Sequence, residues 1–311
     1  MDLQQDFLLP GEKEDADVLT EKVRVLCWVL THSGNHESKA QHVRATWGKR
    51  CNFLIFMSNA NDTRLGAINL NVLDGRKFLW GKTRMAFEYV YKHHFEQFDW
   101  FFKADDDTYA IMENLRYMLS AYDPTYPIYF GAKFRGFMSG GGGYVLSKQA
   151  LKQFVESALH NDSLCQGDPT GVDEDVKIGK CLANVGVMEG DSRDEYGRGR
   201  FFPLSPMTHI MNKLPHWYIH LTHYKPHKGL DCCSDTAITF HYISPEKMYE
   251  MDYLLYGLRP YGIHKDHPYP APLPPDVNSI PQEMLKLEKN QKVFQKRKRK
   301  RVNGRTEYIY Q

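Results

Sequence analysis

The 311-residue sequence has no long apolar run and no large excess of either charge. No stretch reaches the roughly 18 apolar residues that a membrane-spanning helix needs, and residues 1–21 are polar and acidic, without the apolar core of a signal peptide. The 40 lysines and arginines nearly balance the 38 aspartates and glutamates, which argues against a dedicated nucleic-acid-binding protein with its basic excess. No internal repeat is present. The length predicts one large or two modest domains with a substantial core.

Cysteine is sparse, but its number is even, and two glycosylation sequons accompany it. The sequons begin at Asn61 and Asn161. Both observations are common by chance, yet both are explained together if the sequence is the lumenal part of a secretory-pathway protein whose targeting segment lies outside it. We therefore predict that all six cysteines are oxidised. Closeness in the sequence favours the pairs Cys27–Cys51 and Cys165–Cys181 and leaves Cys232 and Cys233 to each other, in a strained vicinal bond, or to a partner.

Apolar runs alternate with amphipathic stripes along the first two thirds of the chain. The predicted strands cover residues 23–30, 52–57, 69–73, 100–103 and 128–134, and the predicted helices cover 40–47, 82–98 and 148–159, with another from 173 onward. Strands that alternate with helices predict an α/β fold, a Rossmann-like, mostly parallel sheet flanked by helices, which binds ligands beyond the carboxyl ends of its strands. From residue 260 the pattern decays into a proline-rich segment and a run of six cations, which predicts a linker and a disordered tail.

Three adjacent aspartates follow the aromatic strand of residues 100–103. Because alternate residues of an extended segment share a face, Asp105 and Asp107 can bind one cation while Asp106 faces the other way. Carboxylate oxygens suit Mn²⁺ or Mg²⁺, which leave coordination positions open for phosphates. This DxD spacing is the one by which nucleotide-sugar glycosyltransferases hold a metal and a diphosphate. The alternative is an acidic turn that caps a helix starting at Thr108, where apolar residues recur at helical spacing.

Five sequence blocks occur in the order that is found in one family: WGKT (80–83), FFKADDDTY (101–109), SGGGGYVLS (139–147), EDVKIG (174–179) and FHY (240–242). The chain resembles the β1,3-glycosyltransferase family that contains the Fringe enzymes, which implies a GT-A glycosyltransferase fold over residues 23–262. Within this family, three further blocks are most similar to the core 1 β1,3-galactosyltransferases: GDSRD (190–194), CCSD (232–235) and LRPYG (258–262).

The resemblance implies a metal-dependent, inverting transfer of galactose from UDP-α-galactose to O3 of N-acetylgalactosamine on serine or threonine of a glycoprotein. It also implies a type II Golgi membrane protein whose anchor lies upstream of this sequence, with a homodimer and a dedicated chaperone as further expected partners. The chain then divides into a flexible stem remnant (1–21), a catalytic domain (22–262) and a proline-rich segment with a basic tail (263–311). The alternatives are a β1,3-transferase with another donor or acceptor, and a non-catalytic chaperone-like or lectin-like relative.

The matching motifs assign roles to individual residues. The resemblance implies that Mn²⁺, with Mg²⁺ as the alternative, is bound by Asp105, Asp107 and His241, although a histidine between two aromatics can equally be a core residue. It makes Asp175 the catalytic base with Glu174 in reserve, although acidic residues also favour a helix N-terminus without any catalytic role. The candidates for donor binding are Thr31, Arg44, Lys82 and Asp106. The candidates for acceptor binding are Gly141 and Gly142, through backbone amides, and Trp217 and Tyr218, by stacking or else as core residues.

Overall fold

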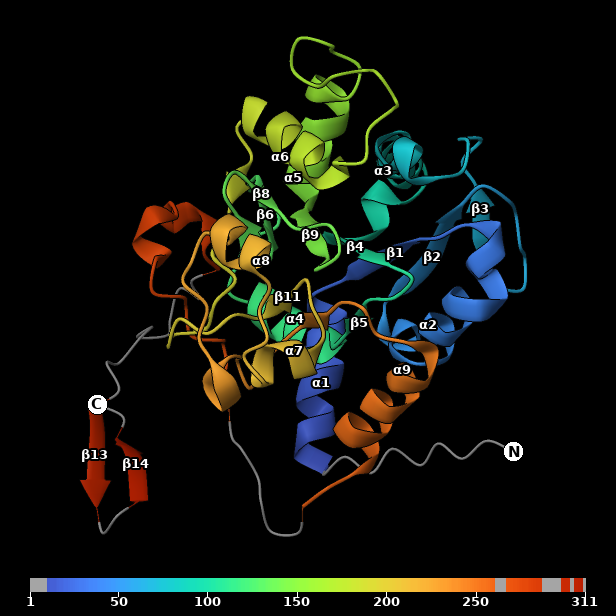
Figure 1. Cartoon of the computed structure of the whole chain (residues 1–311). Coiled ribbons are helices and arrows are strands. Elements are labelled where there is room, and N and C mark those ends of the chain that lie inside the picture. Colours follow the sequence, from blue (N-terminus) through green and yellow to red (C-terminus); the bar gives the residue numbers. More distant parts are fainter. Residues whose placement is uncertain (1–9, 261–266, 287–297, 303–304, 310–311) are drawn as a thin grey trace.

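A seven-stranded sheet runs through the centre of the computed structural model, which describes residues 10–260, 267–286, 298–302 and 305–309 (Figure 1). The strand order is β10-β6-β9-β4-β1-β2-β3. Only β9 runs antiparallel to its neighbours, so the sheet is mostly parallel, as predicted. The strands are β1 (Val25–Leu30), β2 (Phe53–Ser58), β3 (Ala67–Asn69), β4 (Trp100–Asp105), β6 (Ile128–Gly131), β9 (Tyr144–Ser147) and β10 (Met188–Glu189).

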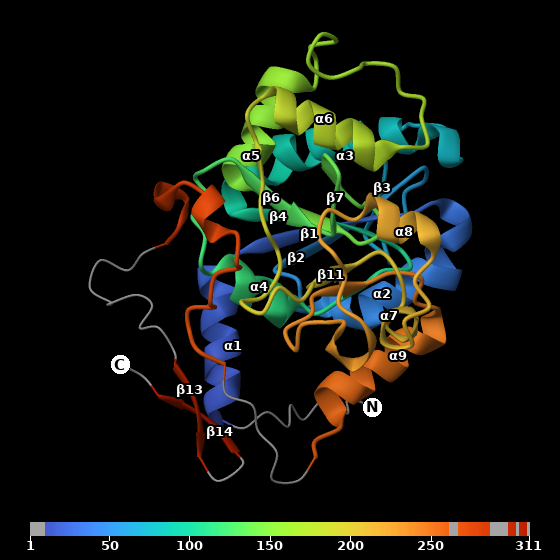
Figure 2. The ribbon, with the colours of Figure 1, turned by 60° about the vertical axis from the view of Figure 1, so that its left-hand side comes forward.

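Helices cover both faces of this sheet (Figures 1 and 2). One face carries α3 (Leu79–His94), α5 (Lys148–Gln153) and α6 (Glu174–Asn184), and the other carries α1 (Pro10–Lys22), α2 (Gln41–Ala45) and α4 (Met112–Leu119). The strands are buried on both sides, which explains why β1 reads as an uninterrupted apolar run. The α/β class that the sequence predicts is therefore confirmed.

A small second sheet lies next to the end of β4 and brings together distant parts of the chain. It joins β11 (Phe201–Phe202), β12 (Thr239–Phe240) and β5 (Tyr109–Ala110). In the antiparallel pair, Phe240 lies opposite Tyr109, so the residue after β12 returns to the residues just before β5. A helix from Thr108 is not formed, because β5 takes these residues into the sheet and α4 begins only at Met112. The helix-capping alternative for the three aspartates is excluded.

The remaining elements lie around this frame. They are β7 (Lys133–Phe134), β8 (Phe137–Met138), α7 (Pro206–Ile210), α8 (His216–Leu221), α9 (Pro245–Asp252), β13 (Lys298–Val302) and β14 (Arg305–Ile309). No helix among the described residues combines the length and the apolar character that crossing a bilayer requires.

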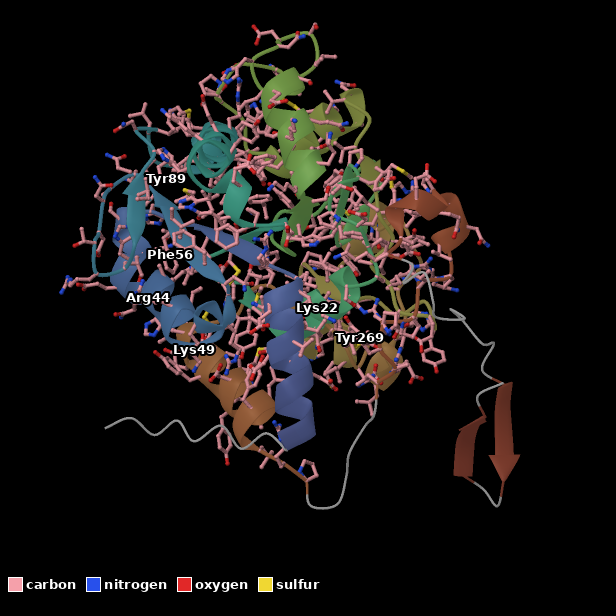
Figure 3. The ribbon with its side chains drawn as sticks, turned by 180° about the vertical axis from the view of Figure 1, so that it is seen from behind. Lys22, Arg44, Lys49, Phe56, Tyr89 and Tyr269 are labelled. Carbon is pink, nitrogen blue, oxygen red and sulfur yellow. A yellow bond between two sulfur atoms is a disulfide. The ribbon has the colours of Figure 1, made fainter. Side chains whose placement is uncertain are left out.

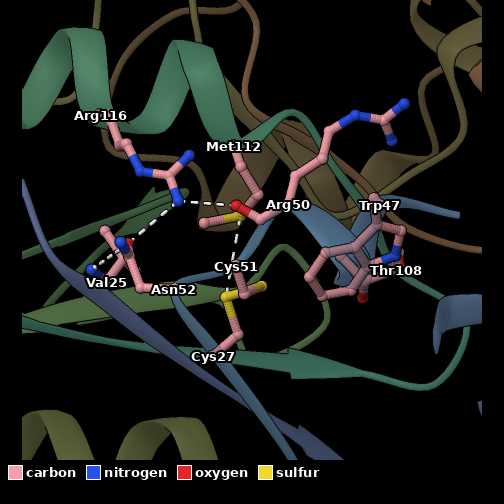
Figure 4. Close-up of a disulfide and its surroundings, with 9 residues drawn as sticks. All are labelled: Val25, Cys27, Trp47, Arg50, Cys51, Asn52, Thr108, Met112 and Arg116. Atoms are coloured by element: carbon pink, nitrogen blue, oxygen red, sulfur yellow. Dashed lines mark hydrogen bonds between the residues drawn. A yellow bond between two sulfur atoms is a disulfide. The ribbon is translucent and has the colours of Figure 1, made fainter. Parts of the chain in front are cut away.

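Disulfides join all six cysteines in the predicted pairs: Cys27–Cys51, Cys165–Cys181 and Cys232–Cys233. The first ties β1 to the turn before β2 (Figure 4). Beside it the guanidinium of Arg116, from α4, donates to the carbonyl oxygen of Arg50 (2.6 Å) and to Oδ1 of Asn52 (3.0 Å). A covalent bond and a buried cation thus fix the start of β2 beside β1, on the face of the sheet that α4 covers.

The described residues near both ends of the chain form more secondary structure and more core contacts than the sequence suggests. Residues 10–22 form α1, whose Leu19 is buried in the core, and residues 1–9 lie outside the described part. Residues 267–286, expected to be a surface linker, bury Ile280 and Met284 against the α4 side of the sheet. Residues 298–302 and 305–309 form the paired strands β13 and β14 where a disordered tail was expected. The domain boundaries at residues 21 and 262 remain predictions.

Candidate active site

Three side chains converge where β4 and β12 end. Carboxylate oxygens of Asp105 and Asp107 and a ring nitrogen of His241 all lie within 4.8 Å of one another. Nε2 of His241 is 2.9 Å from Oδ1 of Asp107 and 3.8 Å from Oδ2 of Asp105. Two hard oxygen ligands and one imidazole fit Mn²⁺ or Mg²⁺ and suit Ca²⁺ less well. The pairing of β5 with β12 brings the histidine back over 134 residues of chain to the aspartates.

Two lysines surround this group with positive charge. Nζ of Lys39 is 3.1 Å from Oδ2 of Asp107, and Nζ of the buried Lys103 is 2.6 Å from Oδ1 of Asp105. Burial alone would raise the pKa of Asp107, but the hydrogen bond and charge of His241, together with Lys39, outweigh it and lower the pKa to about 2. Burial alone would lower the pKa of Lys103, but nearby carboxylates, Asp105 foremost, outweigh it and raise the pKa. Both groups are therefore ionised at neutral pH.

The glycine run packs directly against these side chains. A Cβ on Gly141 would collide with the ring of His241, and a Cβ on Gly140 would lie 2.8 Å from Oε2 of Glu174. The carbonyl of Gly141 accepts a hydrogen bond from Thr108 Oγ1 (3.0 Å). The absence of side chains here lets the backbone approach the histidine and the carboxylates closely.

A cavity of about 400 Å³ opens onto the same residues, a volume in the usual range for a ligand site. It joins the aspartate side of the site to the start of α6 and to the Trp217 side chain. The sequence-predicted residues that line it are Asp105, Gly141, Glu174, Asp175, Trp217 and His241. Asp107 and Gly142 are not among the lining residues: Asp107 contacts His241, and Gly142 is buried.

The two acidic candidates at the start of α6 differ in their surroundings. Glu174 is 6% exposed, accepts a hydrogen bond from the Tyr144 hydroxyl and lies 3.9 Å from Nζ of Lys103. Burial raises its pKa. Asp175 is half-buried, and its two oxygens accept backbone N–H bonds from Gly140 (3.0 Å) and Val176 (2.9 Å). Asp175 is therefore held rigidly at the cavity wall, and each of its oxygens retains a second lone pair.

Most of the donor-binding candidates make contacts within the protein. Asp106 is 6% exposed and accepts from Thr31 Oγ1 and Asn35 Nδ2, both at 2.8 Å. The buried Lys82 pairs with Asp74 at 2.6 Å. Neither Thr31, Asp106 nor Lys82 is among the residues that line the cavity.

The remaining donor candidate, Arg44, lies on α2 at the outer edge of the molecule (Figure 3). There it donates to the carbonyl oxygen of Leu65 (2.8 Å). The structure does not bring Arg44 to the cavity.

The two aromatic candidates separate. Trp217 is 45% exposed and lines the cavity. Tyr218 is 6% exposed and packs edge-on against Phe134 and His209, so for Tyr218 the core alternative holds. This division follows from α8, in which consecutive residues point to different sides of the helix.

Several cavity residues were not singled out from the sequence, among them Lys103, Arg76, Ser139 and Tyr242. A lysine inside an otherwise apolar strand, two residues before Asp105 and so on its face, was a usable signal. Tyr242 is exposed and has a φ of 57°, a conformation that is uncommon for a residue with a side chain and is concentrated at functional sites. No sequence pattern indicates that conformation.

Comparison with known proteins places these features in a family. Residues 20–192, more than half of the chain, match the family model described as Fringe-like. The chain belongs to the Fringe-like family. The match includes the three aspartates, the glycine run and the start of α6. With this family membership, the central sheet and its flanking helices are those of a GT-A glycosyltransferase.

Individual relatives extend the comparison. A glycoprotein-N-acetylgalactosamine 3-beta-galactosyltransferase 1 from Xenopus laevis is 44% identical over 284 residues, which cover 88% of this chain and 77% of the relative. Two beta-1,3-glucosyltransferases are more distant. The one from Mus musculus is 24% identical over 55% of this chain and 35% of the relative, and the one from Homo sapiens is 22% identical over 54% and 34%.

Proposed function

We propose that this protein transfers galactose from UDP-α-galactose to O3 of N-acetylgalactosamine linked to serine or threonine of a glycoprotein, with inversion at the sugar. The observation that carries the proposal is that Asp175 lines the same cavity as Asp105 and His241, with Asp107 in contact with His241. The similarity to the Xenopus laevis galactosyltransferase over most of both chains supports the choice of donor and acceptor.

Asp175 is the proposed base. In a single inverting displacement, the acceptor hydroxyl attacks on the face opposite the leaving diphosphate, and a base on that face takes its proton. The N–H groups of Gly140 and Val176 hold the carboxylate in place, so its free lone pairs can accept the O3 proton. Glu174 also lines the cavity, but it is a weaker candidate, because Tyr144 donates to one of its oxygens, Lys103 lies 3.9 Å from the other and only 6% of the residue is exposed.

Asp105, Asp107 and His241 are the proposed ligands of Mn²⁺, with Mg²⁺ as the alternative. When bound there, the ion supplies the positive charge that neutralises the diphosphate of the donor. Lys103 holds Asp105 in position through a 2.6 Å ion pair, and Lys39 adds a cation beside Asp107. Gly140 and Gly141 line the cavity next to these side chains, and the exposed Trp217 offers its face to the acceptor.

A secretory-pathway location, with the protein in the Golgi lumen, is part of the proposal. Three disulfides support it, since cytosolic proteins rarely keep them. The asparagines of both sequons, Asn61 and Asn161, are exposed and therefore accessible to glycosylation.

A donor-by-acceptor matrix tests the proposal. UDP-galactose, UDP-glucose, UDP-N-acetylglucosamine and UDP-N-acetylgalactosamine are each offered with a GalNAc-threonine peptide, a galactoside and a fucoside, with Mn²⁺ or with EDTA. We expect product only from UDP-galactose with the GalNAc peptide in the presence of Mn²⁺. Transfer from another donor or to another acceptor would indicate a different β1,3-transferase. If UDP protected the protein against heat only in the presence of Mn²⁺ and no product formed, the protein would be a non-catalytic relative.

A further inference from the structure

A second, smaller pocket with a basic lining lies next to the catalytic cavity. Of the described residues that line it, none is acidic. Its lining includes four cations and two histidines: Lys133, Arg193, Arg200, His209, Lys225 and His227. Lys133 and Arg193 have carboxylate partners elsewhere, but the remaining positive charge faces no counter-charge inside the pocket. Such a lining favours an anion.

Arg200 is the strongest sign of an anion site. The residue is 2% exposed, and its side chain donates to Thr236 Oγ1 (3.0 Å) and to the carbonyl oxygen of Arg193 (2.8 Å). Within the described part of the chain it forms no salt bridge with a carboxylate. Asp194 acts on the Arg200 charge only through space, without direct contact, and a buried guanidinium that no carboxylate contacts is costly. An anion in the pocket would offset that cost.

A buried histidine gives a second and independent sign. His209 is 1% exposed, and among the described residues its Nε2 atom has no hydrogen-bond partner. Unpartnered buried polar atoms are rare in folded proteins. A ligand oxygen in the pocket would supply the missing partner.

The size of the pocket limits the anion. Its volume is about 50 Å³, against about 400 Å³ for the catalytic cavity. Since one water needs roughly 10–15 Å³ on this measure, the pocket holds only a few water-sized groups. A carboxylate fits, whereas a sugar ring or a nucleotide does not.

The two cavities share a wall. Phe134 lines both of them. In α8, Trp217 lines the catalytic cavity and the next residue, Tyr218, lines the basic pocket. A polypeptide whose sugar lies against Trp217 would therefore pass close to the basic pocket. The exposed Lys225 and His227 lie at the pocket's outer side.

We propose that this pocket binds the carboxylate of an aspartate or glutamate that flanks the glycosylated residue of the acceptor polypeptide. The inference rests on the proposed function, because it needs a glycopeptide acceptor in the neighbouring cavity. Because the pocket attracts this negative charge, the enzyme is selective for acidic residues around the sugar. The selectivity should weaken at high salt, since Lys225 and His227 are exposed.

The test compares glycopeptides that carry one GalNAc-threonine and have either aspartate or asparagine at each of the four positions on either side. We expect kcat/KM to be roughly three- to tenfold higher for the aspartate peptide at one or two adjacent positions, mainly through KM. In Lys225→Gln and in Lys225→Gln/His227→Gln the ratio should fall towards one. The matched control is Lys228→Gln, which changes an exposed lysine outside the pocket and should keep the wild-type ratio.

The outcomes are distinguishable. An active enzyme with a ratio of one at every position would overturn the anion pocket and leave the proposed function intact. A preference that persisted unchanged in the Lys225→Gln/His227→Gln variant would likewise overturn the pocket alone. Failure to use any GalNAc peptide would instead remove the proposed function, and the anion pocket with it.

Discussion

Replacing Asp175 by asparagine should stop the chemistry while leaving the fold and the donor site in place. Removing a general base typically costs about 10²–10⁴-fold in rate, or about 3–5 kcal/mol of activation free energy. The structural cost is smaller. Asparagine has one acceptor oxygen, so it can satisfy only one of the two N–H groups, of Gly140 and Val176, that the carboxylate satisfies now. Losing one such hydrogen bond costs about 1 kcal/mol and should lower Tm by a few degrees.

Steady-state kinetics with a GalNAc-threonine peptide, together with titration of Mn²⁺ and UDP, separate these effects for Asp175→Asn. The kcat value should fall by at least about a hundredfold, with KM for the peptide and the affinity for Mn²⁺–UDP changing far less. Glu174→Gln is the comparison. It should lose more stability than Asp175→Asn, because it removes a buried charge near Lys103, but it should keep more turnover. Near-normal kcat in Asp175→Asn would refute the assignment of the base, and a collapse of kcat in Glu174→Gln alone would move the base by one residue.

Three further predictions concern the metal group, the glycine run and a buried histidine. Asp107→Ala and His241→Ala should each abolish Mn²⁺-dependent UDP binding in calorimetry, whereas Asp106→Ala should keep part of it; an unchanged affinity in His241→Ala would remove that residue from the ligand set. Gly141→Ala should push the His241 ring away at a cost of about 1–3 kcal/mol and weaken Mn²⁺–UDP binding, and an unaffected affinity would contradict the close packing. Burial lowers the pKa of His209 from 6.5 to about 4, so as the pH falls through this window only the unfolded chain gains the proton. Urea unfolding should then show that the free energy of unfolding falls by about 3 kcal/mol over this pH window, a loss that is absent in His209→Phe.

Local patterns were sufficient to predict the large sheet. The run that forms β1 and the aromatic strand that forms β4 lie within two residues of their predicted bounds, because burial on both faces favours apolar side chains at most positions. The strand predicted at residues 69–73 instead ends at Asn69 as β3. Asn71 adopts a φ of 54°, which turns the chain out of the extended conformation. The apolar pattern does not encode that turn.

The candidate site was predictable in part: the proximity of the two aspartates follows from their spacing, but the position of His241 does not. The i, i+2 spacing correctly predicted that Asp105 and Asp107 lie together, but a turn after the end of β4 at Asp105, rather than an extended strand, brings them there. The approach of His241 depends on the pairing of β5 with β12, two strands of two residues each. Strands this short leave no periodicity to read, so only the resemblance to a known family pointed to the histidine.

The donor candidates show how local partners compete with a ligand for the same side chain. Lys82 lies on the first turn of α3, and Asp74, eight residues earlier, is close enough to neutralise it. Arg44 similarly finds a backbone carbonyl on its own side of the molecule. Lys103 has no such option, because its strand is buried and its charge can be balanced only by the carboxylates at the end of the sheet. A lysine within a buried apolar strand therefore indicates a nearby acidic cluster, and by this criterion the sequence already contained the link between Asp105 and the acidic start of α6.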